Sequence, residues 1–157
     1  MILYHGSKDT SIEVFDLEHS RDSLDFGSGV YLTTILKQAK QRAGKGGAVY
    51  KFDVDFSDLN VVEYKDEDLN YVLYLCRIEL EDVARETIDD FDDADIVMGQ
   101  VLGRVKRFKR RSERFNCGDI QYDEFSKRIK LFDDKDQICF KTQKAVDLLN
   151  KSFIGKV

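Results

Sequence analysis

Apolar and polar residues alternate along this chain with two different periods, and each period predicts a different kind of element. Over residues 48–55 the period is two, with Tyr50, Phe52 and Val54 on one face, which is typical of a half-buried strand. Over residues 66–84 apolar residues recur at spacings of three and four, which predicts a helix with one buried face. Similar patterns predict strands at residues 1–4, 29–34, 59–64, 94–98 and 137–140, and helices at residues 35–43, 119–130 and 142–149 and in a basic stretch that ends at residue 115.

The order of these elements favours a mixed α+β fold, because strands and helices are interspersed without a regular βαβ repeat. Residues 7–25 are polar with a few apolar interruptions, and we expect a long ordered loop there. The chain has no internal repeat and no linker, and its 42% hydrophobic and 35% charged residues are ordinary for a folded protein. We therefore expect a single domain over residues 1–157.

Charge and cysteine content indicate the cellular compartment and the kinds of partner that we expect for this protein. The net charge of −5 gives no global attraction to nucleic acid. Three cysteines without a CxxC pair indicate reduced thiols, and we find no signal peptide and no apolar stretch long enough to span a membrane. We therefore expect a cytoplasmic protein without a membrane partner, and no metal, because the two histidines and the thiols lack the spacing of a zinc site.

The strand ends carry the candidate chemistry. His5 follows an apolar strand and precedes Gly6 and Ser7, while Tyr31 lies in a predicted strand that follows Gly29. A histidine at a strand end is often only a buried, hydrogen-bonded side chain, and a tyrosine in such a strand is often a core residue. The alternative is that the two residues form part of a ligand site.

The order of His5, Tyr31 and Gln137 on three separate predicted strands resembles the H-Y-[E/Q] group, the diphtheria-toxin-type branch of the ADP-ribosyltransferases. Segments at residues 3–7, 20–27, 29–34, 95–99 and 136–142 resemble, in the same order, a small bacterial ADP-ribosyltransferase-like family. The resemblance implies an ADP-ribosyltransferase-like split β-sandwich with flanking helices, and transfer of ADP-ribose from NAD to a cellular target with release of nicotinamide. Members of that family resemble the toxins of bacterial toxin–antitoxin pairs, so a small antitoxin protein is an implied partner.

The resemblance also implies a role for each candidate residue. His5 would hydrogen-bond the adenosine ribose, and Gly6 would let its backbone approach the nicotinamide carboxamide, because glycine has no Cβ. Tyr31 would stack on the nicotinamide ring. The remaining cofactor-binding candidates are Ser7 beside His5, Arg21, which suits the pyrophosphate or is an exposed loop residue, and Phe26, which covers the ligand or anchors the loop.

Gln137 completes the catalytic candidates with His5 and Tyr31, at the position where better-known members carry a glutamate. A carboxylate there would bind the ribose hydroxyl and stabilise the cationic transition state, whereas an amide keeps the hydrogen bond and loses the charge. Asp136 and Glu124 are acids that could compensate, and the sequence does not choose between them.

The basic run at residues 104–114 stands out on an acidic chain. From Arg104 to Arg114 it could bind RNA or an acidic protein such as the antitoxin, or it could be a solvated helix whose charges pair with the acidic stretch at residues 79–95. Two other functions stay open. One is a ribonuclease toxin with His5 or His19 as acid and base. The other is a catalytically degenerate module that binds NAD or a partner.

Overall fold

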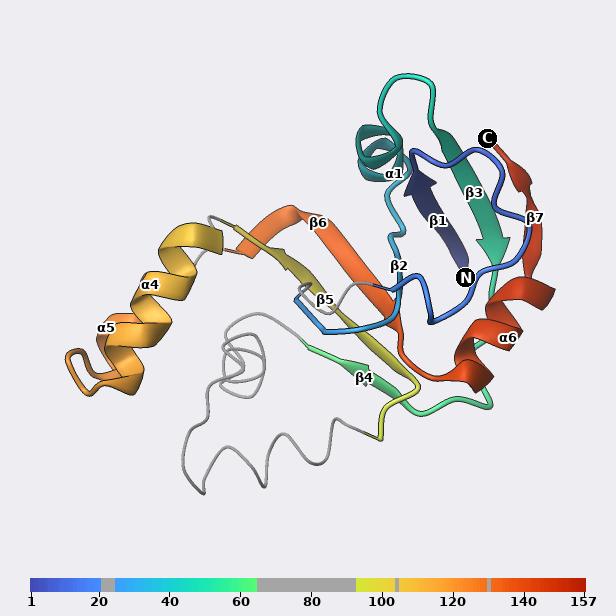
Figure 1. Cartoon of the computed structure of the whole chain (residues 1–157). Coiled ribbons are helices and arrows are strands. Elements are labelled where there is room, and N and C mark those ends of the chain that lie inside the picture. The colour runs from blue at the N-terminus through green and yellow to red at the C-terminus, as the bar shows by residue number, and fades with distance from the viewer. Residues whose placement is uncertain (21–24, 65–92, 104, 130) are drawn as a thin grey trace.

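Two β-sheets and the helices around them form the described part of the protein (Figure 1). The structure, a computed structural model, describes residues 1–20, 25–64, 93–103, 105–129 and 131–157. The mixed α+β class expected from the sequence is confirmed. The predicted helix at residues 66–84, the basic-run residue Arg104 and the candidate Arg21 lie outside the described residues.

The first sheet has the order β1-β3-β7 and is antiparallel throughout. It consists of β1 (Ile2–Ser7), β3 (Ala48–Asp53) and β7 (Phe153–Lys156). The alternation predicted for β3 is confirmed, since Tyr50 and Phe52 belong to the main core while Val49 packs on the opposite face. There β3 and β1 are covered by helix α1 (Leu36–Ala43) through Ala39 and Ala43.

The second sheet has the order β2-β6-β5-β4, with β4 and β5 parallel and the other pairs antiparallel. Its strands are β2 (Val30–Leu32), β6 (Leu131–Phe140), β5 (Ile96–Leu102) and β4 (Val61–Glu63). Tyr4 and Thr33 form an isolated antiparallel bridge, with N–H···O distances of 2.8 and 2.9 Å. This bridge joins the edge of the first sheet to β2 at the edge of the second.

The main core lies where the two sheets face each other. Leu3 and Phe52 from the first sheet pack with Ile138 and Phe140 from the second, and Leu149 of helix α6 (Gln143–Lys151) closes the cluster. The cap predicted for α6 is confirmed, because the Thr142 side chain accepts a hydrogen bond from the Ala145 N–H.

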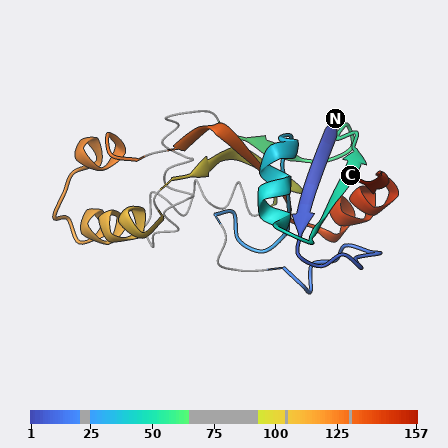
Figure 2. The same ribbon diagram turned by 90° about the horizontal axis from the view of Figure 1, so that it is seen from above.

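A second apolar cluster lies on the other face of β5 and β6. It joins Phe26, Val97 and Cys139 to Phe108 of helix α4 (Val105–Asn116) and Phe125 of helix α5 (Tyr122–Ser126). Strands β5 and β6 form a long ribbon, and α4 and α5 lie at its far end from the first sheet (Figures 1 and 2). None of the helices in the described ranges is both long and apolar enough to span a membrane.

Three predicted elements differ in extent and one strand was not predicted. The strand predicted at residues 137–140 begins already at Leu131. The strand expected to end at Gly99 continues to Leu102, because Gly99 pairs with Gln137 and the pairing resumes after a register shift. The helix expected over 119–130 is a single short one, since Phe125 is its one fully buried anchor. Strand β7 was not anticipated from the sequence, because Phe153 and Ile154 are exposed although the strand pairs with β3.

Candidate functional site

His5 lies on β1 beside Tyr50 and reaches the backbone of Tyr31. Its ring packs edge-on against Phe15, with centroids 5.0 Å apart, and its Nδ1 is 2.7 Å from the carbonyl oxygen of Tyr31. A carbonyl only accepts hydrogen bonds, so Nδ1 carries the proton and Nε2 presents a lone pair. No described residue is hydrogen-bonded to Nε2.

The environment of His5 keeps the imidazole neutral. Burial is the largest effect and lowers its pKa below the usual value of 6.5, and the positive charge of Arg42 lowers it further. The hydrogen bond to the Tyr31 carbonyl acts in the opposite sense and only partly offsets the burial. At neutral pH, His5 is therefore a fixed hydrogen-bond acceptor rather than a cation.

Tyr31 holds the loop that precedes β2. Its hydroxyl accepts a hydrogen bond from the Phe26 N–H and donates one to the Gly27 carbonyl, both at 2.8 Å. Its half-buried ring is nearly parallel to that of Phe26, at 17° and with centroids 6.3 Å apart. Phe26 is fully buried and therefore anchors the loop through its ring. A Cβ on Gly29, at φ 153°, would lie 2.4 Å from the Cys139 sulfur, so the close approach of this loop to β6 requires glycine.

Gln137 is buried on the same face of the second sheet as the Tyr31 side chain. Tyr31 pairs with Cys139, and residues two apart on a strand point to one face. The Gln137 Nε2 donates to Asp25 Oδ2 at 2.8 Å and to the Gln100 carbonyl at 3.1 Å. This assigns the amide orientation, because its oxygen would be repelled by both acceptors. No described residue donates to the Gln137 Oε1.

Asp25 supplies the carboxylate beside Gln137, and sequence reasoning did not single it out. Its Oδ2 also accepts from the Leu102 N–H at 3.3 Å, while its Oδ1 has no hydrogen-bond partner among the described residues. The signal available in the sequence was its place directly before Phe26 in the segment at residues 24–27. A link between residues 112 positions apart could not be read from spacing.

The two acids expected to compensate at Gln137 are engaged elsewhere. The Asp136 carboxylate accepts hydrogen bonds from the Thr33 hydroxyl and from the N–H and hydroxyl of Thr34, so it ties the end of β2 to β6. Glu124 forms an ion pair with Arg128 at 3.2 Å on α5. Among the described acids, Asp25 is the one hydrogen-bonded to Gln137.

Gly6 and Ser7 have structural roles beside His5. A Cβ on Gly6 would lie 2.0 Å from the Ala39 carbonyl oxygen, so glycine is required for the contact between β1 and α1. The Ser7 hydroxyl accepts from the Asp9 N–H at 3.0 Å and begins the following loop.

Tyr31 is the residue that connects these groups. Its carbonyl oxygen binds His5, its hydroxyl holds the Phe26 loop, and its ring shares a sheet face with Gln137. The imidazole lies on the other side of β2, against Phe15, and no contact joins it to the amide in the part of the chain described. On the face of β2 that carries the Tyr31 side chain, the groups are an aromatic ring, a carboxylate oxygen and an amide oxygen, and on the other side is the imidazole nitrogen. That set suits a ligand with hydroxyl donors and a positive charge.

Two hollows on the described surface are not lined by the candidate residues. One lies between α4 and α5 and the other on α1 beside Leu36. Within the described ranges, no group of three or more His, Cys, Asp or Glu side chains is arranged to hold a metal ion.

Comparison with known proteins returns one match. No curated protein matches the chain. No solved structure matches it either. The DUF3990 family, described as a protein of unknown function, matches residues 1–151. The match covers nearly all of the chain, so the protein belongs to the DUF3990 family.

Proposed function

We propose that this protein is a NAD-dependent mono-ADP-ribosyltransferase. In this reaction the C–N bond between nicotinamide and ribose breaks, and nicotinamide leaves with the bonding electrons. A nucleophile on the target forms the new bond at the ribose carbon and loses a proton. The observation that carries the proposal is the hydrogen bond from Gln137 to Asp25 beside Tyr31. The proposal includes the split β-sandwich of the ADP-ribosyltransferases, because two sheets joined at one edge are compatible with it.

The Asp25–Gln137 pair supplies the negative charge that an amide alone lacks. A glutamine at position 137 cannot by itself stabilise the positive charge of the transition state. With Asp25 at 2.8 Å from the amide nitrogen, a carboxylate lies within one hydrogen bond of Gln137. The amide oxygen accepts a ribose hydroxyl, and the carboxylate stabilises the positive charge that develops on the sugar as nicotinamide departs. One preorganised contact of this kind is worth about 10²–10³ in rate.

His5 and Tyr31 bind and orient the substrate in this proposal. The neutral His5 accepts a ribose hydroxyl at Nε2, since Nδ1 is committed to the Tyr31 carbonyl. We assign the half-buried Tyr31 ring, which is nearly parallel to that of Phe26, to contact with the nicotinamide. Its hydroxyl is engaged by the loop backbone, so it contributes shape rather than acid or base chemistry.

The cellular setting is part of the same proposal. We assign the protein to the toxin half of a bacterial toxin–antitoxin pair that acts in the cytoplasm and is neutralised by a small antitoxin. Induced expression of the chain alone would then arrest growth, and Asp25→Asn would relieve the arrest at equal protein level. Equal arrest by the two forms would contradict this assignment.

NAD binding and ADP-ribose transfer test the biochemical proposal directly. At an NAD concentration 100 times its dissociation constant, binding stabilises the native state by about 2.7 kcal/mol, or about 5–11 °C in melting temperature for a chain of this size. Labelled NAD in a cell lysate should label a target with the wild type and not with Asp25→Asn. Absence of both stabilisation and labelling would refute the function. Stabilisation without nicotinamide release would indicate a degenerate binding module.

A further inference from the structure

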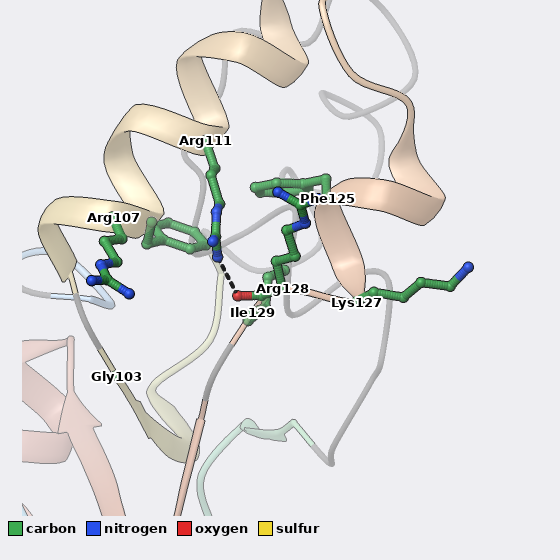
Figure 3. A pocket seen from close by; sticks show the side chains of 8 residues that line it. Gly103, Arg107, Arg111, Phe125, Lys127, Arg128 and Ile129 are labelled. Atoms are coloured by element: carbon green, nitrogen blue, oxygen red, sulfur yellow. Dashed lines mark hydrogen bonds between the residues drawn. The ribbon is translucent and has the colours of Figure 1, made fainter.

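A basic pocket of about 170 Å³ lies between α4 and α5, at the far end of the β5–β6 ribbon (Figures 1 and 3). Arg107 and Arg111 line it from α4, and Lys127 and Arg128 from the end of α5 and the residue after it. Phe108 and Phe125 also line the pocket. In Figure 3 the Arg111 side chain extends from α4 toward Ile129, while Arg107 and Lys127 lie at opposite sides of the pocket.

Aromatic packing fixes the walls of this pocket. The Phe125 ring is fully buried, stacks on Phe115 at 5.0 Å and packs against Phe108 at 6.0 Å. The Arg111 Nη1 donates to the Arg128 carbonyl at 2.7 Å, so one guanidinium bridges the two elements. A planar guanidinium held in this way keeps further N–H donors for an anion.

The pocket has more positive charge than its described neighbours neutralise. Arg128 is paired with Glu124 at 3.2 Å. Among the described residues, no carboxylate lies within 4.0 Å of the charged groups of Arg107, Arg111 or Lys127. Three cations therefore line a hollow in which the described residues place no counter-charge beside them, on a chain whose net charge is −5. Such a hollow attracts an anion.

The size of the pocket and its surroundings select the kind of anion. Sites for whole small molecules occupy about 300–1,000 Å³, so this pocket accommodates one charged group rather than a complete nucleotide. Exposed cations continue along α4 outside the pocket at Lys106, Arg110 and Arg114. Cations four residues apart on a helix are separated by about 6 Å along its axis. A row of this kind matches a polymer with charges at short regular intervals, as on a nucleic-acid strand.

We propose that the pocket between α4 and α5 binds a phosphate of a nucleic-acid backbone, with the exposed cations of α4 contacting its neighbouring phosphates. Arg111 and Arg128 contact the phosphate inside the pocket, and Arg107 and Lys127 flank it. RNA and DNA share this chemistry. The inference does not depend on the proposed transferase function, because the pocket includes none of His5, Tyr31 or Gln137.

Fluorescence anisotropy with labelled U12 RNA and dT12 DNA tests the inference on the full chain. The KCl concentration is varied from roughly 50 to 400 mM, so that the screening of charges increases along the series. About four neutralised phosphates predict a slope of log K against log salt of about −3 for a single strand. Arg107→Ala and Lys127→Ala should each weaken binding about 5–10-fold and reduce the magnitude of the slope by about one. Both side chains are exposed, so these variants are expected to keep the fold. The matched control Lys45→Ala removes an exposed cation on the first sheet's side of the molecule and should change binding less than twofold (about 0.4 kcal/mol).

Arg111→Ala and Arg111→Lys separate contact from packing. The affinity of the alanine variant should be at least about tenfold lower. Lysine keeps the positive charge but not the planar, bidentate geometry of the guanidinium group, so the lysine variant should recover part of the affinity. Comparison of RNA with DNA identifies the preferred strand. A flat salt response, or equal affinity of Arg107→Ala, Lys127→Ala and Lys45→Ala, would overturn the inference. Displacement of U12 by a polyglutamate peptide of equal charge at equal or lower concentration would also overturn it, in favour of an acidic protein.

Discussion

Gln137→Glu is the most informative single substitution, because it introduces the glutamate found in the ADP-ribosyltransferases that the sequence resembles and is nevertheless expected to destabilise this protein. The Gln137 amide nitrogen donates to the Asp25 carboxylate and to the Gln100 carbonyl. A carboxylate at position 137 would leave both acceptors without this donor and place two negative charges about 3 Å apart at a buried position.

The size of the effect follows from comparing two costs. At an effective dielectric constant of about 20, two charges 2.8 Å apart repel by about 6 kcal/mol. Protonating a glutamate of ordinary pKa at pH 7 costs about 4 kcal/mol, which is less than the repulsion. The two carboxyl groups therefore share one proton, and the destabilisation is limited to about 4 kcal/mol. We expect a loss of about 2–4 kcal/mol in the free energy of unfolding at pH 7, or about 4–16 °C in melting temperature.

The pH dependence distinguishes this mechanism from poor packing. Repulsion raises the pKa of the new carboxyl in the folded state, so the penalty grows with pH between the unfolded value of about 4.3 and that raised pKa, and it disappears as the pH falls toward about 4.3. At pH 5 the loss should be about 1 kcal/mol. The double variant Asp25→Asn/Gln137→Glu exchanges the amide and the carboxylate and should recover at least half of the loss.

Urea unfolding at pH 7 and pH 5 measures both quantities. The matched control is Gln143→Glu, because the Gln143 amide also donates to a carboxylate, that of Asp147 at 2.7 Å, but on the exposed surface of α6. It should cost at most about 0.5 kcal/mol. The reasoning is refuted if Gln137→Glu is as stable as the wild type at pH 7, or if its loss is the same at both pH values.

Three other predictions follow from the same contacts. Tyr31→Phe leaves the Phe26 N–H and the Gly27 carbonyl without the phenol and should cost about 1–3 kcal/mol in unfolding free energy, whereas unchanged stability would contradict the loop-anchoring role. Gly29→Ala forces a Cβ against Cys139 and should lower the melting temperature by at least about 5 °C, and a shift below about 1 °C would show that this close approach is not required. Because burial lowers the pKa of His5, stability should fall as the pH drops through about 6.5, by at most about 1.4 kcal/mol per pH unit. His5→Gln should reduce that slope, and an unchanged slope would place the titration elsewhere.

Local patterns in the sequence were sufficient for much of the fold. The period-two alternation of β3 and the cap at Thr142 depend on neighbouring residues, and both predictions are confirmed. Strand β7 was not predicted, because its apolar residues are exposed. Its pairing with β3 therefore produces no alternation of buried apolar and exposed polar residues in the sequence.

The candidate site was predictable in part. The sequence placed His5 and Tyr31 in one ligand site, which stays a prediction. The hydrogen bond of the His5 ring to the Tyr31 backbone carbonyl is a contact that sequence spacing cannot show. Asp25 was missed for a related reason, since its contact with Gln137 depends on how the loop before β2 packs over β6. Asp136 and Glu124 were considered because one is adjacent to Gln137 and the other near it in sequence, but the alternation of strand side chains turns Asp136 to the other face.

Release of nicotinamide from NAD is the direct assay of the proposed transferase activity. Purified wild-type protein and Asp25→Asn would be incubated with NAD and a cell lysate as the source of target, and free nicotinamide would be measured by chromatography. The account predicts enzyme-dependent release by the wild type and a rate about 10²-fold or more lower for Asp25→Asn, because the carboxylate that stabilises the developing charge is lost. No release above that of lysate alone, or equal rates for the two proteins, would contradict it.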